Sequence, residues 1–173
     1  MAERRSPAGE LADAMAAASG PAVALRELPF LAQVNVRTAL PEPPGAVAQV
    51  RGRTALWLGP DEWLVVGADG EQGEIERAFA DALSVVDVSG QRTTLELRGP
   101  RAREVLEKGC SLDLHPWRFS AGRCAQTLLA RADVVLWQVD DEPGYRLLVG
   151  CSFAPYLVHW LLDAMREFGE VAA

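Results

Sequence analysis

The chain has 173 residues, of which 49% are hydrophobic and 24% are charged, as expected for one globular domain that buries a core of its own. Its net charge of −7 argues against nucleic acids and anionic membranes as partners, because both bind basic surfaces. No apolar run reaches the length of a membrane span, and acidic residues near the N-terminus argue against a secretory signal, so we expect a cytoplasmic protein.

Apolar periodicity in the first half of the chain predicts two helices and four strands. The helices are predicted over residues 9–18, which are rich in alanine, and over residues 74–83, where apolar residues recur at helical spacing as far as Leu83. A proline-rich loop covers residues 40–45, and Gly-Pro-Asp at residues 59–61 predicts a tight hairpin turn. The predicted strands cover residues 22–28, 32–38, 54–58 and 62–66.

The strongest local pattern lies in residues 85–114. A short strand of β-branched residues leads into a second strand at residues 93–97, which alternates with period two. Leu95 and Leu97 can therefore face a core, while Glu96 faces away from it.

A turn at Gly99-Pro100 then predicts the start of a short helix, because proline has no N–H to lose in a first helical turn. Gly109 is expected to cap the end of this helix. Three more strands are predicted at residues 125–130, 134–139 and 145–149, before a final helix at residues 152–168 whose apolar stripe includes Phe153, Tyr156 and Trp160.

Short turns between most of these strands predict antiparallel pairing. The helices are few and separated, so the expected fold class is α+β, with helices packed on antiparallel sheets. We expect a single domain over residues 20–169, after a partly flexible N-terminal segment (1–19) and before a short tail (170–173).

The sequence also contains an internal echo. The first predicted helix of the echo follows residues 55–57, an acidic turn and residues 64–67. The second follows residues 135–137, another acidic turn and residues 147–150. The echo indicates either a structural duplication or a chance likeness between two β-β-α units, and the sequence favours neither. A duplication predicts that the two units take matching places in the fold.

Side chains that could perform chemistry are few and scattered. His159 is expected at the surface of its helix, His115 in a turn, and the acidic residues 140–142 in a solvated turn rather than at an ion site. The three cysteines are widely spaced and odd in number, which indicates reduced thiols rather than disulfides or a zinc site. We therefore expect no catalytic residues and no metal site, and we expect Trp117, in a loop, at an interface.

Motifs along the chain resemble the folate-binding aminomethyltransferase family, the group of the glycine-cleavage T-protein. The matching motif reads Asp87-x-Ser89, Thr94-Leu95-Glu96-Leu97-x-Gly99-Pro100-x-Ala102, Leu106 and Asp113. The chain resembles more closely the gamma subunit family of heterotetrameric sarcosine oxidase. The pieces that carry this likeness include residues 58–64, 87–89, 112–116 and 145–149.

The resemblance implies a folate-binding aminomethyltransferase-like domain made of two similar β-α units. It also implies partner subunits alpha, beta and delta, in an oxidase that demethylates sarcosine to glycine and transfers the one-carbon unit to tetrahydrofolate. Flavin, NAD and tetrahydrofolate would then be bound by the partner subunits, and no cofactor would be bound by this chain.

The family places a functional aspartate at the position of Asp113, which makes Asp113 the one candidate cofactor-binding residue. Its expected neighbours differ, because residues 132–134 replace a Gly-Gly plus Asp segment and Gly150-Cys151 replaces an asparagine. We therefore expect Asp113 to serve a turn, and the chain to be a non-catalytic accessory subunit. The alternatives are a stand-alone folate-dependent one-carbon transfer protein anchored by Asp113, and a scaffold module unrelated to sarcosine.

Overall fold

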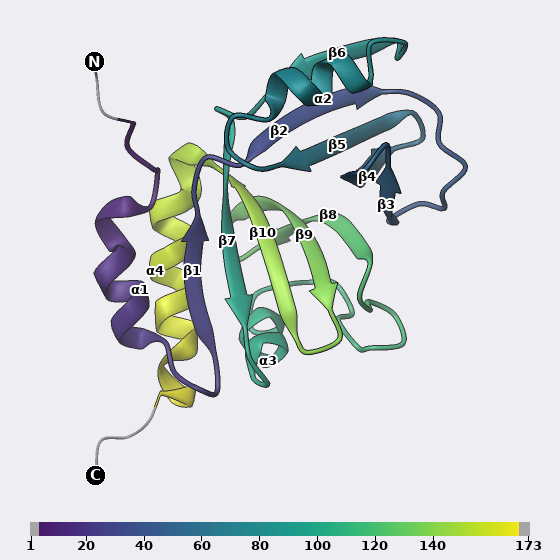
Figure 1. Ribbon diagram of the computed structural model, residues 1–173. Helices are drawn as coiled ribbons and strands as arrows, with labels where there is room; N and C mark the ends of the chain where they lie inside the picture. The colour runs from purple at the N-terminus through teal and green to yellow at the C-terminus, as the bar shows by residue number, and fades with distance from the viewer. Residues whose placement is uncertain (1–3, 170–173) are drawn as a thin grey trace.

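The computed structural model describes residues 4–169, which form two five-stranded antiparallel sheets with helices on their outer faces (Figure 1). The predicted tail and the first three residues of the predicted flexible segment lie outside the described residues. Sheet A has the order β1-β7-β10-β9-β8, and sheet B has the order β3-β4-β5-β2-β6. The strands are β1 (Ala24–Leu28), β2 (Ala32–Arg37), β3 (Val47–Val50), β4 (Arg53–Gly59), β5 (Glu62–Gly67), β6 (Ser84–Asp87), β7 (Arg92–Arg98), β8 (Arg123–Leu129), β9 (Ala132–Asp140) and β10 (Gly144–Gly150).

The helices cover the faces that the two sheets turn away from each other. Three of them pack on sheet A, and α2 packs on sheet B (Figure 1). None of the helices within residues 4–169 combines the length and apolarity that crossing a bilayer requires. The helices are α1 (Ala12–Ala18), α2 (Gln72–Ala78), α3 (Ala102–Glu107) and α4 (Ala154–Met165), with short 3-10 segments η1 (Gly9–Leu11), η2 (Cys151–Phe153) and η3 (Arg166–Phe168).

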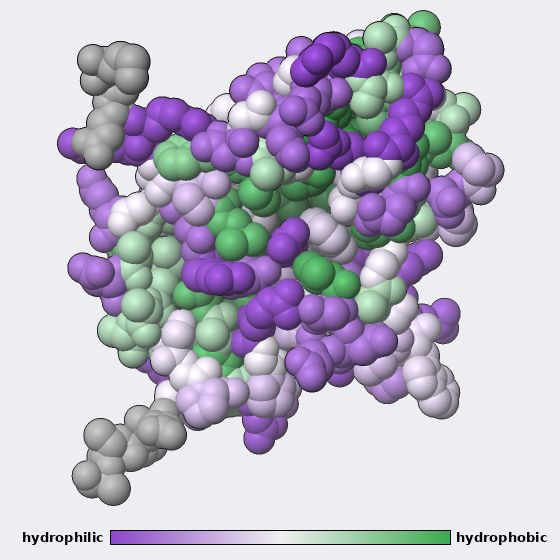
Figure 2. All heavy atoms as spheres, in the orientation of Figure 1, coloured by the Kyte–Doolittle hydropathy of each residue, from purple (hydrophilic) through white to green (hydrophobic). Residues whose placement is uncertain are grey.

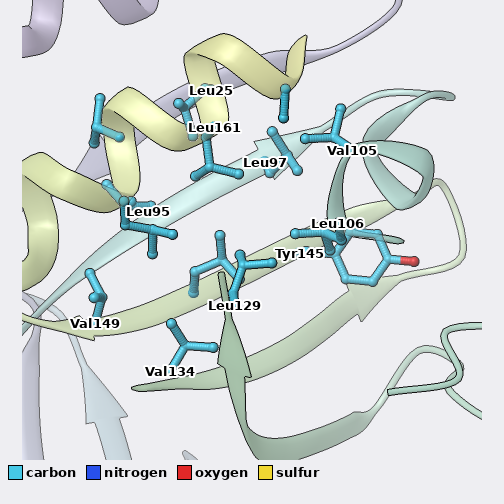
Figure 3. Close-up of a cluster of buried hydrophobic side chains, with 14 of the residues drawn as sticks. Leu25, Leu95, Leu97, Val105, Leu106, Leu129, Val134, Tyr145, Val149 and Leu161 are labelled. Atoms are coloured by element: carbon cyan, nitrogen blue, oxygen red, sulfur yellow. The ribbon is translucent and has the colours of Figure 1, made fainter. Parts of the chain in front are cut away.

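The largest cluster of buried apolar side chains lies between sheet A and its helices. Leu95 and Leu97 of β7 point toward Leu161 of α4 and Val105 of α3, and all four are fully buried (Figure 3). The predicted alternation of β7 is therefore confirmed on this face. A second set of apolar residues lies between the two sheets, so the central strands are buried on both faces. That set comprises Leu56, Leu64, Val66, Cys124, Val135, Trp137 and Leu148.

The two sheets have equivalent strand orders, so the chain does contain the structural duplication that the sequence had left open against chance. Strands β3, β4, β5 and β2 occupy the places in sheet B that β8, β9, β10 and β7 occupy in sheet A. The fifth strand of each sheet is exchanged, because β1 precedes β2 but pairs with β7, and β6 precedes β7 but pairs with β2. The chain therefore crosses between the sheets twice, at residues 29–31 and 88–91.

The residues that match between the two halves of the echo nevertheless lie on opposite faces of their sheets. Leu56 pairs with Leu64 and faces the other sheet, whereas Leu136 pairs with Leu147 and faces α4. A slip of one residue moves every side chain of a strand to the other face. The architecture is thus repeated, while the residue-by-residue correspondence read from the sequence was wrong by one position.

Other local expectations differ from the structure for identifiable reasons. Helix α2 ends at Ala78 rather than at residue 83, because the chain turns and the Leu83 N–H donates to the Arg37 carbonyl oxygen at 2.9 Å, at the start of the β2–β6 pairing. Leu83 is consequently 85% exposed. Phe153 is also exposed and does not belong to the buried stripe of α4.

Gly109 does not adopt the left-handed conformation of a C-cap. A Cβ atom at this position would lie 2.5 Å from the Cζ2 atom of Trp160 and 3.2 Å from the backbone nitrogen of Ala130. Glycine is therefore required here by the close approach of the Trp160 ring, which packs across the end of α3.

Candidate functional site

Asp113 is exposed and lies on the loop between α3 and β8. Its Oδ1 atom accepts the backbone N–H of His115 at 3.0 Å, the local turn geometry that aspartate commonly stabilises. The His115 ring packs edge-on against Trp117, with 5.7 Å between the ring centroids. Trp117 is 92% exposed at the surface of this loop, where a partner could bury it.

The cysteine thiols lie apart from one another, and each is free. Burial raises the pKa of the Cys124 thiol to about 11, against a smaller opposing effect of its contact with the Trp57 carbonyl oxygen. Burial also raises the pKa of Cys151. A thiol with a raised pKa is protonated at neutral pH, so neither of these two cysteines is an activated nucleophile. Residues 4–169 contain no group of three or more His, Cys, Asp and Glu side chains placed to hold a metal ion.

A cluster of charged side chains surrounds Glu96, in the middle of β7. Its carboxylate is 2% exposed, although it points away from the helices. The Nε atom of Arg26 donates to it at 2.7 Å and the Nε atom of Arg146 at 3.4 Å, while Nε of Arg98 lies 3.5 Å away. We call this group, Arg26, Arg98 and Arg146 around Glu96, the arginine surface.

The strand register explains how residues so distant in sequence meet at this site. Arg26 of β1 and Arg146 of β10 each lie directly opposite Glu96, on its two sides. Arg146 in turn lies opposite Trp137 of β9, and its guanidinium carbon stands 4.9 Å from the centroid of the Trp137 ring. Opposed residues in neighbouring strands share a face, so the four side chains form one row across sheet A.

A glycine makes room for the third arginine. Arg98 lies across the strand from Gly144, and its Nη1 atom donates to Oδ2 of Asp140 at 2.7 Å. A Cβ atom at Gly144 would lie 2.8 Å from that Nη1 atom and 2.6 Å from Oδ1 of Asp140. The missing side chain at Gly144 therefore allows the ion pair to lie over the backbone of β10.

The arginine surface lies on the part of sheet A that sheet B leaves uncovered. Figure 2 shows a hydrophilic band over β1, β7 and β10, next to a hydrophobic hollow between the two sheets. Arg26 has 68% of its side chain exposed, Arg98 39% and Arg146 26%. The guanidinium groups thus face solvent while the carboxylate that holds them is buried beneath.

Glu96 is ionised by its surroundings. Burial acts to raise its pKa, but the hydrogen bond and charge of Arg26, with the charges of Arg98 and Arg146, outweigh burial and lower the pKa below its usual value. A carboxylate with a lowered folded pKa contributes stability above its unfolded pKa of about 4.3. That contribution is lost as the pH falls through the lower folded value.

We expect Glu96→Gln to reduce the free energy of unfolding at neutral pH by about 1–3 kcal/mol, because the buried carboxylate loses charged hydrogen bonds. The difference between the variant and the wild type should shrink below about pH 4. Chemical denaturation across this pH range measures both effects. Glu76→Gln, at an exposed position of α2, is the control and should change little; a pH-independent difference for Glu96→Gln would contradict this account.

The sequence indicated that Glu96 alternates with two core leucines, but it did not identify the site. Its partners lie 70 residues earlier, at Arg26, and 50 residues later, at Arg146. The signal that could have found them is the arginine in each strand at the position that pairs with Glu96, and it can be read once the strand order is known.

The chain is similar to known proteins in sequence and in fold. Residues 14–167 match the model of the family described as "Sarcosine oxidase, gamma subunit family". The chain is 42% identical to the sarcosine oxidase subunit gamma of Corynebacterium sp. (strain P-1), over 96% of this chain and 92% of the relative. It is 40% identical to that of Corynebacterium sp. (strain U-96), over 98% and 94%.

Two solved structures share the fold. One chain of the heterotetrameric sarcosine oxidase from Corynebacterium sp. U-96, solved with pyrrole 2-carboxylate, aligns over 98% of both chains with a TM-score of 0.83 and 37% identity. The glycine cleavage system aminomethyltransferase T from Bartonella henselae aligns over 88% of this chain and 49% of that chain, with a TM-score of 0.65 and 16% identity. The second likeness establishes the predicted aminomethyltransferase-like fold.

Proposed function

The chain belongs to the sarcosine oxidase gamma subunit family, and from this membership we propose that it acts as an accessory subunit of a heterotetrameric sarcosine oxidase. Its partners are the alpha, beta and delta subunits of that enzyme. The observation that supports this proposal most strongly is the alignment of 98% of the chain with one chain of a heterotetrameric sarcosine oxidase, at a TM-score of 0.83.

The charged groups of the chain support a role in assembly rather than in catalysis. The carboxylate of Glu96 is fixed in ion pairs, and Asp113 accepts a backbone N–H in an exposed turn. A general acid or base needs a pKa near the working pH, whereas the pKa of Glu96 is lowered away from it. We propose that the oxidative demethylation of sarcosine, with flavin, NAD and tetrahydrofolate, takes place on the partner subunits in the cytoplasm.

Co-expression of the tagged chain with the alpha, beta and delta subunits tests the proposal. We expect the tag to retain all three partners through affinity purification and gel filtration, in a constant ratio. Retention of none of them, with the tagged chain folded, would favour a scaffold module unrelated to sarcosine.

The isolated chain is expected to produce no hydrogen peroxide from sarcosine and to show no flavin absorbance after purification. Peroxide assays and visible spectra measure both properties.

Calorimetry with tetrahydrofolate tests the remaining alternative, a folate-dependent transfer protein. Micromolar binding that Asp113→Ala abolishes would favour that alternative over the accessory role.

A further inference from the structure

The arginine surface consists of guanidinium groups that are already held in place. Arg26 is fixed by Glu96, Arg98 by Asp140, and Arg146 lies over the Trp137 ring while it contacts Glu96. An arginine side chain normally loses rotamer freedom when it binds a partner, and fixing it beforehand reduces that cost. The surface is therefore organised for binding before any partner arrives.

Stability alone does not account for this arrangement. A buried ion pair stabilises a fold weakly, and apolar residues of similar size in its place often give the fold equal or greater stability. Glu96 lies at the centre of β7, on the face of sheet A that turns toward sheet B. Leu148 and Val135 lie on the same face and belong to the apolar layer between the sheets. A buried carboxylate at this position does, however, hold three arginines at the surface in defined orientations.

The charge of the surface is opposite to the charge of the chain. Three guanidinium groups face two carboxylates, Glu96 and Asp140, so the surface has an excess of one positive charge in a protein whose net charge is −7. The exposed donors match carboxylates, because a guanidinium can donate two parallel hydrogen bonds to one carboxylate. Arginine is also enriched among the residues at the centres of protein interfaces.

We propose that the arginine surface docks an acidic segment of a partner subunit, whose Asp or Glu side chains pair with Arg26, Arg98 and Arg146. This inference rests on the proposed function, since it requires the oxidase complex. A second copy of the chain is the rival occupant, and the experiment separates the two. A nucleic acid fits less well, because most of its phosphates would lie outside this small surface, against the acidic remainder of the chain.

The test uses two double variants in the four-subunit complex. Arg26→Gln with Arg146→Gln removes two guanidinium groups from the arginine surface. Arg77→Gln with Arg166→Gln removes the same charge from exposed positions on α2 and η3. Thermal unfolding of each isolated chain checks that both fold. The single variant Arg26→Gln, at the most exposed of the three arginines, is the milder substitute if the first double variant does not fold.

We expect the first double variant to weaken binding to the partner subunits by about tenfold or more, and the second to change it less than about twofold. Rising salt should weaken binding of the wild type more than binding of the first variant. Equal binding by the two double variants would overturn this inference alone, whereas failure of the wild-type chain to join the complex would overturn the proposed function as well. If the first double variant still joins the complex but the isolated chain no longer associates with itself, the occupant is a second copy of the chain and the inference is overturned.

Discussion

Replacing Trp63 with alanine is expected to lower the free energy of unfolding of the isolated chain by about 3–5 kcal/mol. Trp63 lies on β5, is 1% exposed, and fills the space between sheet B and α2. It packs with Ile75 of the helix and with Phe79, the residue that follows the helix, so its removal leaves a large cavity at the centre of that contact. Chemical denaturation of the variant and the wild type measures the difference.

Trp117→Ala is the matched control, because it removes the same side chain from a position that is 92% exposed. It should change the stability of the isolated chain by less than about 0.5 kcal/mol. A comparable loss of stability in the two variants would show that the apolar layer beneath α2 is not the source of the Trp63 effect.

Gly99→Ala is expected to destabilise the chain by about 2–6 kcal/mol, through two causes that act together. Gly99 has a φ of +122°, which side chains of L-residues rarely allow. A Cβ atom there would also lie 2.6 Å from the carbonyl oxygen of Ala22 and 3.0 Å from Cα of Val23. Both neighbours are backbone atoms, so neither can move aside without disturbing the start of β1.

Gly70→Ala separates the two causes. Gly70 also has a positive φ, +84°, but no atom lies within 4 Å of the added Cβ. Gly70→Ala should lower the free energy of unfolding by about 1–2 kcal/mol, which is the strain of the left-handed backbone conformation alone. Thermal melts of the two variants measure the difference, and equal melting temperatures would exclude the close approach of β1 as the reason for glycine at position 99.

Local patterns in the sequence predicted most of the strands, because period-two alternation reflects the burial of one strand face at a time. They failed at β3, a four-residue edge strand that joins β4 through a turn in which Arg51 and Gly52 both have positive φ. Such two-residue turns usually carry Asn-Gly or Asp-Gly, so Arg-Gly gave little signal. The end of α2 was missed because tertiary pairing of β6 with β2 competes with helical periodicity there.

The candidate site depends on pairing between strands, which local patterns do not determine. Asp113 could be named from the resemblance alone, and its role stays a prediction. The arginine surface requires β1 to pair with β7 rather than with β2, its neighbour in the chain. Adjacent strands joined by a three-residue connection would ordinarily be expected to form a hairpin, and that arrangement would separate Arg26 from Glu96.

The exchange of edge strands between the sheets sets the order in which the chain can fold as it leaves the ribosome. Every strand of sheet B comes from residues 32–87, so this sheet can form once that stretch has been synthesised. Strand β1 is made earlier but must wait for β7, and for β10 before sheet A closes around Glu96. During that interval β1 has α1 beside it but lacks its neighbouring strand, so the edge of β1 that will pair with β7 is open to pairing with other chains.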